Sequence, residues 1–560
     1  MPKLVECVPN FSEGRDKTVI GAITKEIETT EGVKLLDVDP GADTNRTVVT
    51  FIGTPEGVKE AAFKAIKKAG ELIDMRKHRG AHARLGATDV CPFVPVSDVT
   101  MNDCVQIAKA LGKRVADELG IPVYLYESAA TRKERQNLAD IRKGEYEGLP
   151  EKLKDPVWQP DFGEAKFNPR SGATVIGARE FLIAYNVNLN TRDRKLAHDI
   201  ALSIREAGRA SRDENGQIVR DEQGIAIKTP GILKAVKAVG WYIDEYEQAQ
   251  ISMNLVNYKI TPPHVAFDEI CRLAAQKGLR VTGSELVGLI PLQAMLEAGK
   301  YYLLKQGKSP GVPEKELIKV AIKSLGLNDI AEFDPDKKII EYQFGARFGP
   351  LASMRVADFA DETSTDSPAP GGGSVSALAG SMGAALTSMV ANLTLGKAGT
   401  ETEFDELKEV ALRAQHIKDE LLRAIDRDTD AFNRVMDAFR LPKGSAQQQA
   451  EREQAIQDAT KQAALVPLNV MQTANQSLEQ VLIVAGKGLE NVLSDSGVAA
   501  IMSRACAEGA FLNVTINLKG IADSAFNEET LNEANRLLAL IRINEKKALD
   551  LVESRMNGSR

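Results

Sequence analysis

A stretch of sequence that begins at Leu4 recurs from Phe181, and this internal repeat constrains the fold more than any other feature. "LVECVPNFSEGRDKTVIGAITKEI" aligns without a gap with "FLIAYNVNLNTRDRKLAHDIALSI", so that Arg15-Asp16 falls on Arg192-Asp193. Both copies begin with an apolar run of strand length and continue with apolar residues at helical spacing. A repeat of this kind indicates two copies of one supersecondary unit.

The order of strand-like and helix-like runs defines that unit. Over residues 1–125, short apolar runs such as "KLVECV", "RTVVTFIG" and "IPVYLY" alternate with amphipathic stretches, and Pro55 stands where a helix would begin. The alternation indicates a layered α/β sandwich. We therefore predict an α+β region of two βαββαβ units, a duplicated ferredoxin-like fold, with a single large sheet as the alternative. Within the second unit, "RDENGQIVRDEQG" predicts an exposed hairpin around Asn215-Gly216.

After about Lys337 the pattern changes to that of helices. Strand-like runs almost vanish, and segments with helical periodicity begin near Ser374, Glu403, Ala446, Leu478, Ser496 and Glu528. The predicted domains are residues 1–180 and 181–336 in the α+β region, a linker at 337–352, and an all-α domain at 353–560. The segment "SVSALAGSMGAALTSMVANLTLG" is long enough to cross a bilayer, but its many hydroxyl side chains favour a close-packed helix within a protein, and we expect no membrane association.

Charge and cysteine content exclude several classes of protein. The net charge of -7 and the pI near 5.6 argue against a general nucleic-acid binder, whose footprint is a basic excess. The five cysteines are scattered and never spaced as CxxC, which fits neither a disulfide framework nor a cysteine zinc site. Because the N-terminal segment lacks the apolar core of a signal peptide, we expect a cytoplasmic protein.

The most suggestive cluster of titratable residues is "KHRGAHARLGATDVCP". His78 and His82 stand four apart, but Gly80 weakens a helix between them and no third ligand follows at a usual spacing, so we expect no metal. A neutral imidazole can act as a general base near neutral pH, which makes His82 a catalytic candidate, with a structural histidine as the alternative. The arginines that would attract an anionic substrate are Arg76, Arg79 and Arg84. The aspartate that would orient the imidazole is Asp37, Asp39 or Asp43.

Three loops suit a ligand site. "PNFSEGRD" follows a strand and precedes a helix, so its amides would either hold a carboxylate or simply cap the helix. "PVWQPDFGEAKFNPRSGATVIGARE" lies between the repeats as a long loop rich in glycine and proline, and such loops are often functional. "SPAPGGGSVSALAG" would let its backbone approach a ligand and would favour negative charge, but it lacks the ending of a Walker A motif.

An aspartate lies within the apolar stripe of one predicted helix. Helical steps of three and four residues from Leu407 pass through Asp428. Burial disfavours the ionised carboxylate, so Asp428 needs a partner or a raised pKa, as proton-transferring carboxyl groups often have. A buried aspartate that caps another helix or pairs with a base is the alternative. We predict that Asp495 caps a helix, and that Asn513 and Asn517 are polar ligands in the cavity of Asp428.

Taken in order, these motifs resemble the bifunctional formimidoyltransferase-cyclodeaminase family. The resemblance runs through "LVECVPNFSEGRD", "HARLGATDVCPFVPV", "GATVIGAREFLIAYNVNL", "GSELVGLIPL", "APGGGSVSALAGSMGAAL" and "FLNVTINL". It implies a duplicated ferredoxin-like transferase region, a helical cyclodeaminase domain and a homo-oligomer. It also implies two steps of histidine degradation: the formimidoyl group moves from N-formimidoyl-L-glutamate to tetrahydrofolate, and 5-formimidoyltetrahydrofolate cyclises to 5,10-methenyltetrahydrofolate with release of ammonia.

The resemblance implies roles for particular residues. The proton acceptor of the transferase lies in the motif matched by His82, and that of the cyclodeaminase lies in the motif matched by Asp428. The family's folate-binding segment matches Gly163, Glu164, Ala165, Lys166, Phe167, Asn168, Pro169, Arg170, Ser171 and Gly172. The expected co-substrate is tetrahydrofolate, with or without a polyglutamate tail, and neither step needs a metal or a redox cofactor.

Other activities would fit parts of this pattern. A formyl-transferring folate enzyme fused to a methenyltetrahydrofolate cyclohydrolase would release no ammonia. A catalytically silent folate-binding scaffold would bind without turnover, and a metal-dependent hydrolase would lose its activity on chelation. The chain also has Ala83 where members of the family often have proline after the histidine, so the rigidity of this loop is expected to differ.

Overall fold

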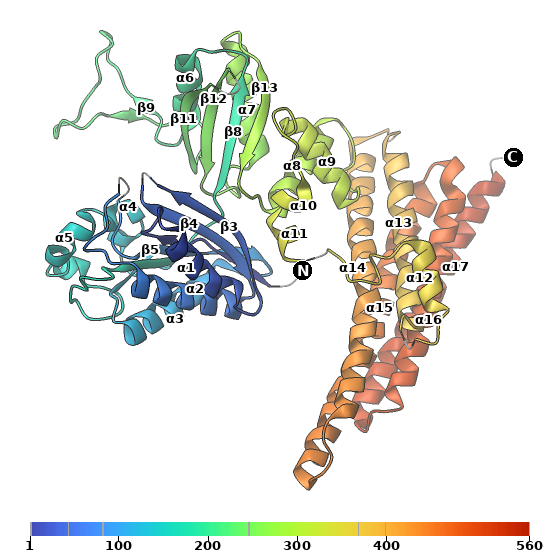
Figure 1. Ribbon diagram of the computed structural model, residues 1–560. Helices are drawn as coiled ribbons and strands as arrows, with labels where there is room; N and C mark the ends of the chain where they lie inside the picture. The colour runs from blue at the N-terminus through green and yellow to red at the C-terminus, as the bar shows by residue number, and fades with distance from the viewer. Residues whose placement is uncertain are drawn as a thin grey trace. The chain divides into compact units, whose positions relative to one another are not determined.

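The chain forms two compact units. The computed structural model describes residues 3–42, 44–80, 83–244, 247–345, 347–367, 369–397 and 399–558. The first unit comprises residues 1–295 and 322–345, and the second comprises residues 296–321 and 346–560. An α/β region with mixed sheets is therefore followed by a helical region (Figure 1). The limits of the individual domains stay predictions.

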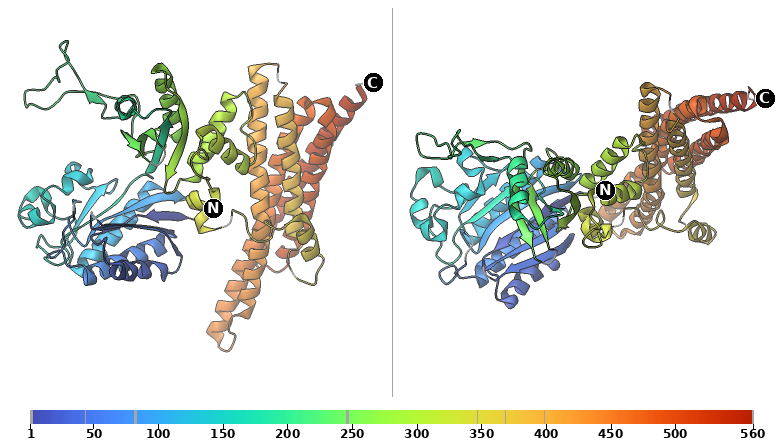
Figure 2. Two further views of the ribbon diagram at one scale, coloured as in Figure 1. Left: turned by 45° about the horizontal axis from the view of Figure 1, so that its top comes forward. Right: turned by 90° about the horizontal axis from the view of Figure 1, so that it is seen from above.

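The first sheet of the α/β unit has the strand order β3-β4-β1-β5-β7-β6, and β2 continues β1 between β4 and β5. Strands β1 to β5 pair antiparallel, whereas β7 runs parallel to β5 and β6. Helices α1, α2 and α3 cover one face of this sheet (Figure 2). The elements are β1 (Leu4–Cys7), β2 (Asn10–Phe11), α1 (Lys17–Glu28), β3 (Val33–Gly41), β4 (Arg46–Gly53), α2 (Pro55–Leu72), β5 (Thr88–Ser97), α3 (Met101–Leu119), β6 (Val123–Glu127), α4 (Leu138–Ile141), α5 (Glu145–Lys152) and β7 (Thr174–Ala178).

The second sheet repeats this strand order as β11-β12-β8-β13, with every pair antiparallel. Its first helix begins like that of the first sheet, because Asp193 caps α6 and the aligned Asp16 caps α1. The elements are β8 (Ile183–Leu189), α6 (Arg194–Ile204), β9 (Arg209–Ala210), β10 (Lys228–Thr229), β11 (Val236–Ile243), β12 (Gln248–Leu255), α7 (Pro263–Gln276), β13 (Val281–Val287), α10 (Pro335–Lys338) and α11 (Ile340–Phe344). Residues 340–344, predicted as linker, are thus helical.

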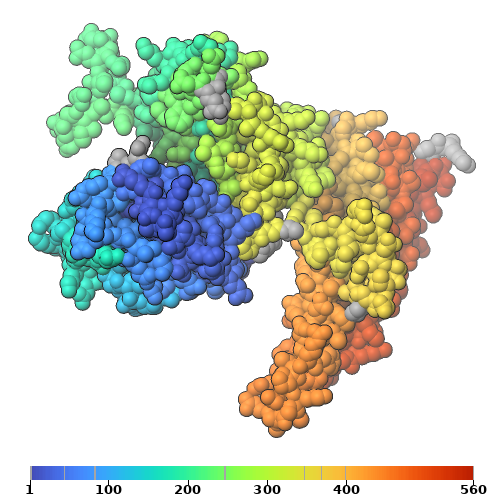
Figure 3. Space-filling view, in the orientation of Figure 1, coloured from blue at the N-terminus to red at the C-terminus, as the bar shows by residue number. Residues whose placement is uncertain are grey.

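An arm leaves the second sheet between β9 and β10. Bridges between Arg212 and Ile218 and between Arg220 and Ala226 hold it together, and Gly216 and Gly224 turn the chain with positive φ. The arm projects from the surface of its unit (Figure 3). The exposed hairpin predicted around Asn215-Gly216 is therefore present, with a second turn at Gly224.

The helical unit is a bundle of long helices packed around a large apolar core, with a smaller apolar cluster between α13, α14 and α15. Figures 1 and 2 show α14 and α15 running past the ends of their neighbours. The helices are α12 (Val356–Thr363), α13 (Gly372–Leu395), α14 (Glu401–Arg440), α15 (Ala446–Lys487), α16 (Leu493–Leu518) and α17 (Ser524–Gly558), while α8 (Leu292–Lys305) and α9 (Glu314–Leu325) each belong in part to this unit.

Two expectations for the helices need comment. The prediction of a separate helix from Leu478 is wrong, since α15 continues through this residue without a break. Helix α13 is the one helix, in the part of the chain that the structure describes, with the length and hydropathy of a membrane span. Of its most apolar window, 61% is buried inside the unit. Packing against neighbouring helices accounts for its small apolar residues.

Candidate functional site

The loop predicted to contain the transferase base is anchored on its N-terminal side. His82 itself, with Ala81, lies outside the described residues. The amide Nδ2 of Asn45, at the start of β4, donates to the carbonyl of Arg79 over 3.0 Å. Gly80 lies so close to Thr44 that an added Cβ would stand 2.1 Å from the Thr44 carbonyl oxygen. The backbone just before His82 is therefore held against β4.

His78 anchors the same loop rather than reacting. Its ring is buried, its Nε2 lies 2.8 Å from the carbonyl oxygen of Asn45, and its Nδ1 accepts from Nε of Arg84 over 3.2 Å. An Nδ1 that accepts leaves the proton of a neutral imidazole on Nε2, which donates to Asn45. Burial lowers the pKa of His78, the Asn45 hydrogen bond opposes this shift, and the charge of Arg84 adds to it. His78 is thus a neutral structural histidine.

Two of the three arginines of the loop pair with carboxylates, whereas Arg79 is exposed and donates to the carbonyl of His78. The guanidinium of Arg84 is buried and donates to Glu147 through two hydrogen bonds of 2.7 and 2.8 Å and to Glu145 over 2.7 Å. Arg76 pairs with Asp74 through two hydrogen bonds of 2.8 and 2.7 Å. The prediction that Arg84 attracts an anionic substrate is wrong, because its charge fixes the loop to α5.

The structure brings the predicted folate segment to the C-terminal side of this loop. Gly86 and Gly172 form an antiparallel bridge, and the amide of Ala87 donates to the carbonyl of Ser171 over 2.8 Å. Gly172 has a φ of +67°, and an added Cβ would lie 2.1 Å from the carbonyl oxygen of Leu85. Only glycine allows the two segments to approach so closely. The predicted folate segment and the C-terminal flank of His82 therefore lie side by side where β7 and β5 begin, at one end of these two strands.

Part of the folate segment lines a cavity of about 600 Å³. The side chain of Asn168 fixes its shape, since Oδ1 accepts from the amides of Arg170 and Ser171 and Nδ2 donates to the carbonyl of Gly120. The lining residues are Gly163, Glu164, Lys166, Phe167, Asn168 and Pro169 of the segment, with Ala116, Asp117 and Gly120. Residues 174–178, predicted as part of this long loop, instead form the buried strand β7.

The "PNFSEGRD" turn makes structural contacts next to these two segments. The carboxylate of Asp16 accepts from the amides of Thr18 and Val19, so the start of α1 is filled by its own cap. The hydroxyl of Ser12 donates to the carbonyl of Gly86 over 2.7 Å. The structure therefore shows a capped helix here rather than an open site for the carboxylate of a ligand.

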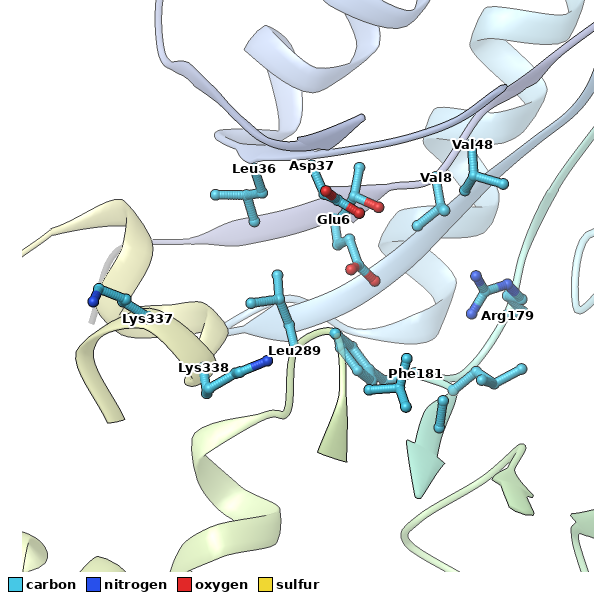
Figure 4. Close-up of a pocket in the computed structure, with 15 residues that line it drawn as sticks. Glu6, Val8, Leu36, Asp37, Val48, Arg179, Phe181, Leu289, Lys337 and Lys338 are labelled. Carbon is cyan, nitrogen blue, oxygen red and sulfur yellow. The ribbon is translucent and has the colours of Figure 1, made fainter. Parts of the chain in front are cut away.

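A larger cavity of about 670 Å³ lies between the two sheets, within the α/β unit (Figure 4). A register shift between Leu35 and Asp37 brings Leu36 and Asp37 to its wall. Figure 4 shows Glu6 in the middle of the cavity with Arg179 on one side and Lys338 on the other. Burial raises the pKa of Glu6 to about 7, and the charge of Arg179 opposes this shift.

This cavity was missed by the sequence analysis. A charged residue inside the apolar run "LVEC" was a visible signal, but nothing in the sequence indicates that Glu6 would lie near Arg179. Of the acidic residues expected beside His82, Asp37 lines this cavity, Asp39 is exposed, and Asp43 lies outside the described residues.

Asp428 lies on a cavity of about 380 Å³ in the helical unit. Its side chain is half-buried rather than part of the core, because it faces this space. Burial raises the pKa of Asp428, while the hydroxyl and the backbone N–H of Ser374 donate to its carboxylate and lower it. The lining residues are Ala369, Gly371, Gly372, Gly373, Asp428, Thr429, Ala431, Phe432, Val435, Thr460, Ala463, Asn513, Ile516 and Asn517.

The glycine-rich turn at the start of α13 makes room for this carboxylate. A Cβ added to Gly373 would lie 2.2 Å from Oδ1 of Asp428. The backbone can therefore approach the carboxylate, and the helix N-terminus favours its charge. Asp428 thus accepts from the first turn of another helix, as the alternative interpretation of this residue predicted, and it also faces a cavity, while its role in proton transfer stays a prediction.

Three further polar residues of the helical unit were predicted. Asn513 and Asn517 line the cavity of Asp428, and their amide nitrogens donate to the carbonyls of Gly509 and Ala463 over 2.8 Å each. Asp495 is not an N-cap, because α16 begins after Val492 and Asp495 lies within its first turn. A carboxylate there still interacts favourably with the helix dipole.

No group of three or more histidine, cysteine, aspartate or glutamate side chains that could hold a metal ion occurs among the residues that the structure describes. The two cavities with predicted site residues present carboxyl, amide and backbone groups. Such groups suit proton transfer and hydrogen bonding to a polar organic ligand.

Comparisons with known proteins match both units. Three family models match: the formiminotransferase domain, N-terminal subdomain, at residues 4–179, the formiminotransferase domain at 184–345, and formiminotransferase-cyclodeaminase at 355–536. The formimidoyltransferase-cyclodeaminase of Dictyostelium discoideum is 45% identical over 559 residues, 99% of this chain and 100% of that protein. The glutamate formimidoyltransferase of Streptococcus pyogenes serotype M1 is 44% identical over 303 residues, covering 54% of this chain and 94% of its own.

The helical region has a relative of its own. A methenyltetrahydrofolate cyclohydrolase of Methylorubrum extorquens is 40% identical over 203 residues, 36% of this chain and 97% of that protein. The similarity to the protein from Dictyostelium, in contrast, spans both units in one alignment. This chain therefore belongs to the formimidoyltransferase-cyclodeaminase family.

Proposed function

We propose that this protein is a bifunctional folate enzyme of histidine degradation. It transfers the formimidoyl group from N-formimidoyl-L-glutamate to tetrahydrofolate and then cyclises 5-formimidoyltetrahydrofolate to 5,10-methenyltetrahydrofolate with release of ammonia. The observation that carries this proposal is the 45% identity over the whole length of a formimidoyltransferase-cyclodeaminase. The cavity lined by the predicted folate segment and the cavity of Asp428 lie in different units, which supports a separate site for each reaction.

The transfer step is assigned to the region where the His82 loop and the folate segment meet. N5 of tetrahydrofolate attacks the formimidoyl carbon, and the attacking nitrogen must lose a proton. Neutral His82 accepts this proton and returns it to the departing amino group of glutamate. The anchors on both sides of His82, through Asn45 and Gly172, support this role because a general base must be held within hydrogen-bonding reach.

Ring closure is assigned to Asp428. N10 attacks the carbon of the formimidoyl group, and the carboxylate of Asp428 takes the proton that N10 loses. The same proton then goes to the amino group, which leaves as ammonia. A carboxyl group whose pKa is raised by burial suits a group that must act first as a base and then as an acid.

The remaining features of the proposal follow from chemistry and topology. The carboxylates of the donor and of the folate tail, with or without polyglutamate, call for basic partners, and Lys166 lines the cavity of the folate segment. The proposal includes no metal, because proton transfer by His82 and by Asp428 accounts for the two steps as written above. The shared strand order of the two sheets supports two ferredoxin-like subdomains. We further propose a cytoplasmic homo-oligomer.

The test mixes the pure protein with N-formimidoyl-L-glutamate and tetrahydrofolate and follows ammonia together with the methenyl chromophore. His82→Asn should abolish transfer while supplied 5-formimidoyltetrahydrofolate still cyclises, and Asp428→Asn should do the reverse. Equal loss of both activities in each folded variant would contradict the assignment of two sites. Chromophore changes without ammonia would favour a cyclohydrolase, the activity of the relative from Methylorubrum.

A further inference from the structure

The hydroxyl group of Ser374 stands between two acceptors. Ser374 is fully buried in the first turn of α13, and its Oγ lies 2.9 Å from the carbonyl oxygen of Ile425 and 3.3 Å from Oδ2 of Asp428. A hydroxyl carries one proton, so it can donate fully to only one acceptor at a time, while its oxygen can still accept. Both acceptors belong to α14, one turn apart on the face that packs against α13.

No other charged group competes for Asp428 among the described residues that line its cavity. Helix α13 contains no charged residue at all. Charged side chains on neighbouring turns of the packed helices are exposed or have partners of their own. Asp430 is exposed, and Asp426 accepts from the amides of Leu351 and Ala352. The remaining charged residues form ion pairs: Arg427 with Glu420, Lys461 with Asp523, and Glu508 with Arg542. Ser374 is therefore the partner that responds to the charge of Asp428.

We propose that Ser374 is a positioning residue for ring closure, and that its hydroxyl turns between Asp428 and the carbonyl of Ile425 as Asp428 loses and gains a proton. When Asp428 is ionised, the hydroxyl donates to its carboxylate. When Asp428 is protonated, the hydroxyl donates to Ile425 and its oxygen accepts from the carboxylic acid. Each protonation state of Asp428 thus keeps one hydrogen bond.

The proton count of the reaction is unchanged by this movement. The proton that Asp428 takes from N10 is the one it gives to the departing amino group, and Ser374 keeps its own proton throughout. Because each protonation state of Asp428 has a hydrogen bond, neither state is stabilised so strongly that the carboxyl group stops acting as a base or as an acid. This inference rests on the proposed function, since it concerns the residue assigned to ring closure.

The experiment compares Ser374→Ala with Ser381→Ala. Ser381 is a matched control, because it lies on the same helix, is buried, and donates to the carbonyl of Lys418 on α14, at 3.1 Å, instead of to a carboxylate. The measurement is the pH dependence of kcat/KM for cyclisation of supplied 5-formimidoyltetrahydrofolate by the full-length protein. Thermal unfolding checks that the helical unit of each variant is folded, and the transferase activity checks that the α/β unit is unaffected.

The hydrogen bond that Ser374 donates to ionised Asp428 is stronger than the one that it accepts from the neutral acid, so loss of the hydroxyl disfavours the ionised form on balance. We expect the acidic limb of the profile to move to higher pH by about one unit, which lowers activity below the limb about tenfold. Ser381→Ala should lose similar stability without this movement, and Ser374→Thr should restore the limb. An unchanged limb in folded Ser374→Ala, or an equal shift in Ser381→Ala, would overturn the inference. A wild-type protein that releases no ammonia would instead overturn the proposed function.

Discussion

Replacing Gly373 by alanine should separate the two activities of the protein. The added Cβ would lie 2.2 Å from Oδ1 and 2.5 Å from Cγ of Asp428, far inside any normal contact. Relief of this clash requires the carboxylate to move by about 1 Å, and a displacement of that size in a reacting group can cost about 100-fold in rate. The corresponding increase in the activation barrier is about 2.7 kcal/mol. The transferase site lies in the other compact unit and should keep its activity.

The assay follows ammonia release from supplied 5-formimidoyltetrahydrofolate, with formimidoyl transfer measured separately on the same preparation. Gly486→Ala is the matched control, since Gly486 lies inside helix α15 and an added Cβ there would meet nothing within 4 Å. That change should leave both activities intact and raise stability by roughly 0.5–1 kcal/mol. If folded Gly373→Ala cyclised its substrate at the wild-type rate, the position of Asp428 would not limit ring closure, and the reasoning above would fail.

Two further predictions concern the α/β unit. Because burial raises the pKa of Glu6 from its ordinary value near 4.5 to about 7, the protonated form favours the fold, and stability should fall by up to roughly 3 kcal/mol as pH rises through this window. The test compares thermal unfolding at pH 5 and at pH 8. Glu6→Gln should abolish the difference in stability between these two pH values. If the difference persisted in the variant, another group would be its cause. Gly172→Ala should lower formimidoyl transfer by about 100-fold with cyclisation retained, because its Cβ would clash with Leu85 beside the His82 loop. Gly216→Ala has the same positive φ without any clash and should leave transfer unchanged, so equal losses in the two variants would implicate backbone strain alone.

Local signals predicted much of the secondary structure. The aligned Asp16 and Asp193 mark the starts of equivalent helices because a helix cap depends only on its own first turn. The periodicity around Asp428 placed it within the apolar stripe of its helix and predicted a partner or a raised pKa, and the structure shows a half-buried carboxyl group with both. The cap and the stripe could be predicted because each depends on the sequence of a single helix.

Features that depend on distant segments could not be predicted. Arg84 looked available for a substrate, but Glu145 and Glu147 neutralise it from a helix some sixty residues away. Ser374 gave no signal in the sequence, since its role depends on the packing of α13 against α14. The strand β7 was hidden in a glycine-rich loop because its neighbours in the sheet, β5 and β6, come from earlier in the chain.

The arm between β9 and β10 is a suitable place to attach a label or a tag to the protein. No residue from Ser211 to Pro230 is buried, and the turns at Gly216 and Gly224 make hydrogen bonds only within the arm. A fluorophore or an affinity tag attached at its tip would displace no core side chain. The protein could thus be immobilised or labelled there without changing a residue that lines any of the three cavities described above.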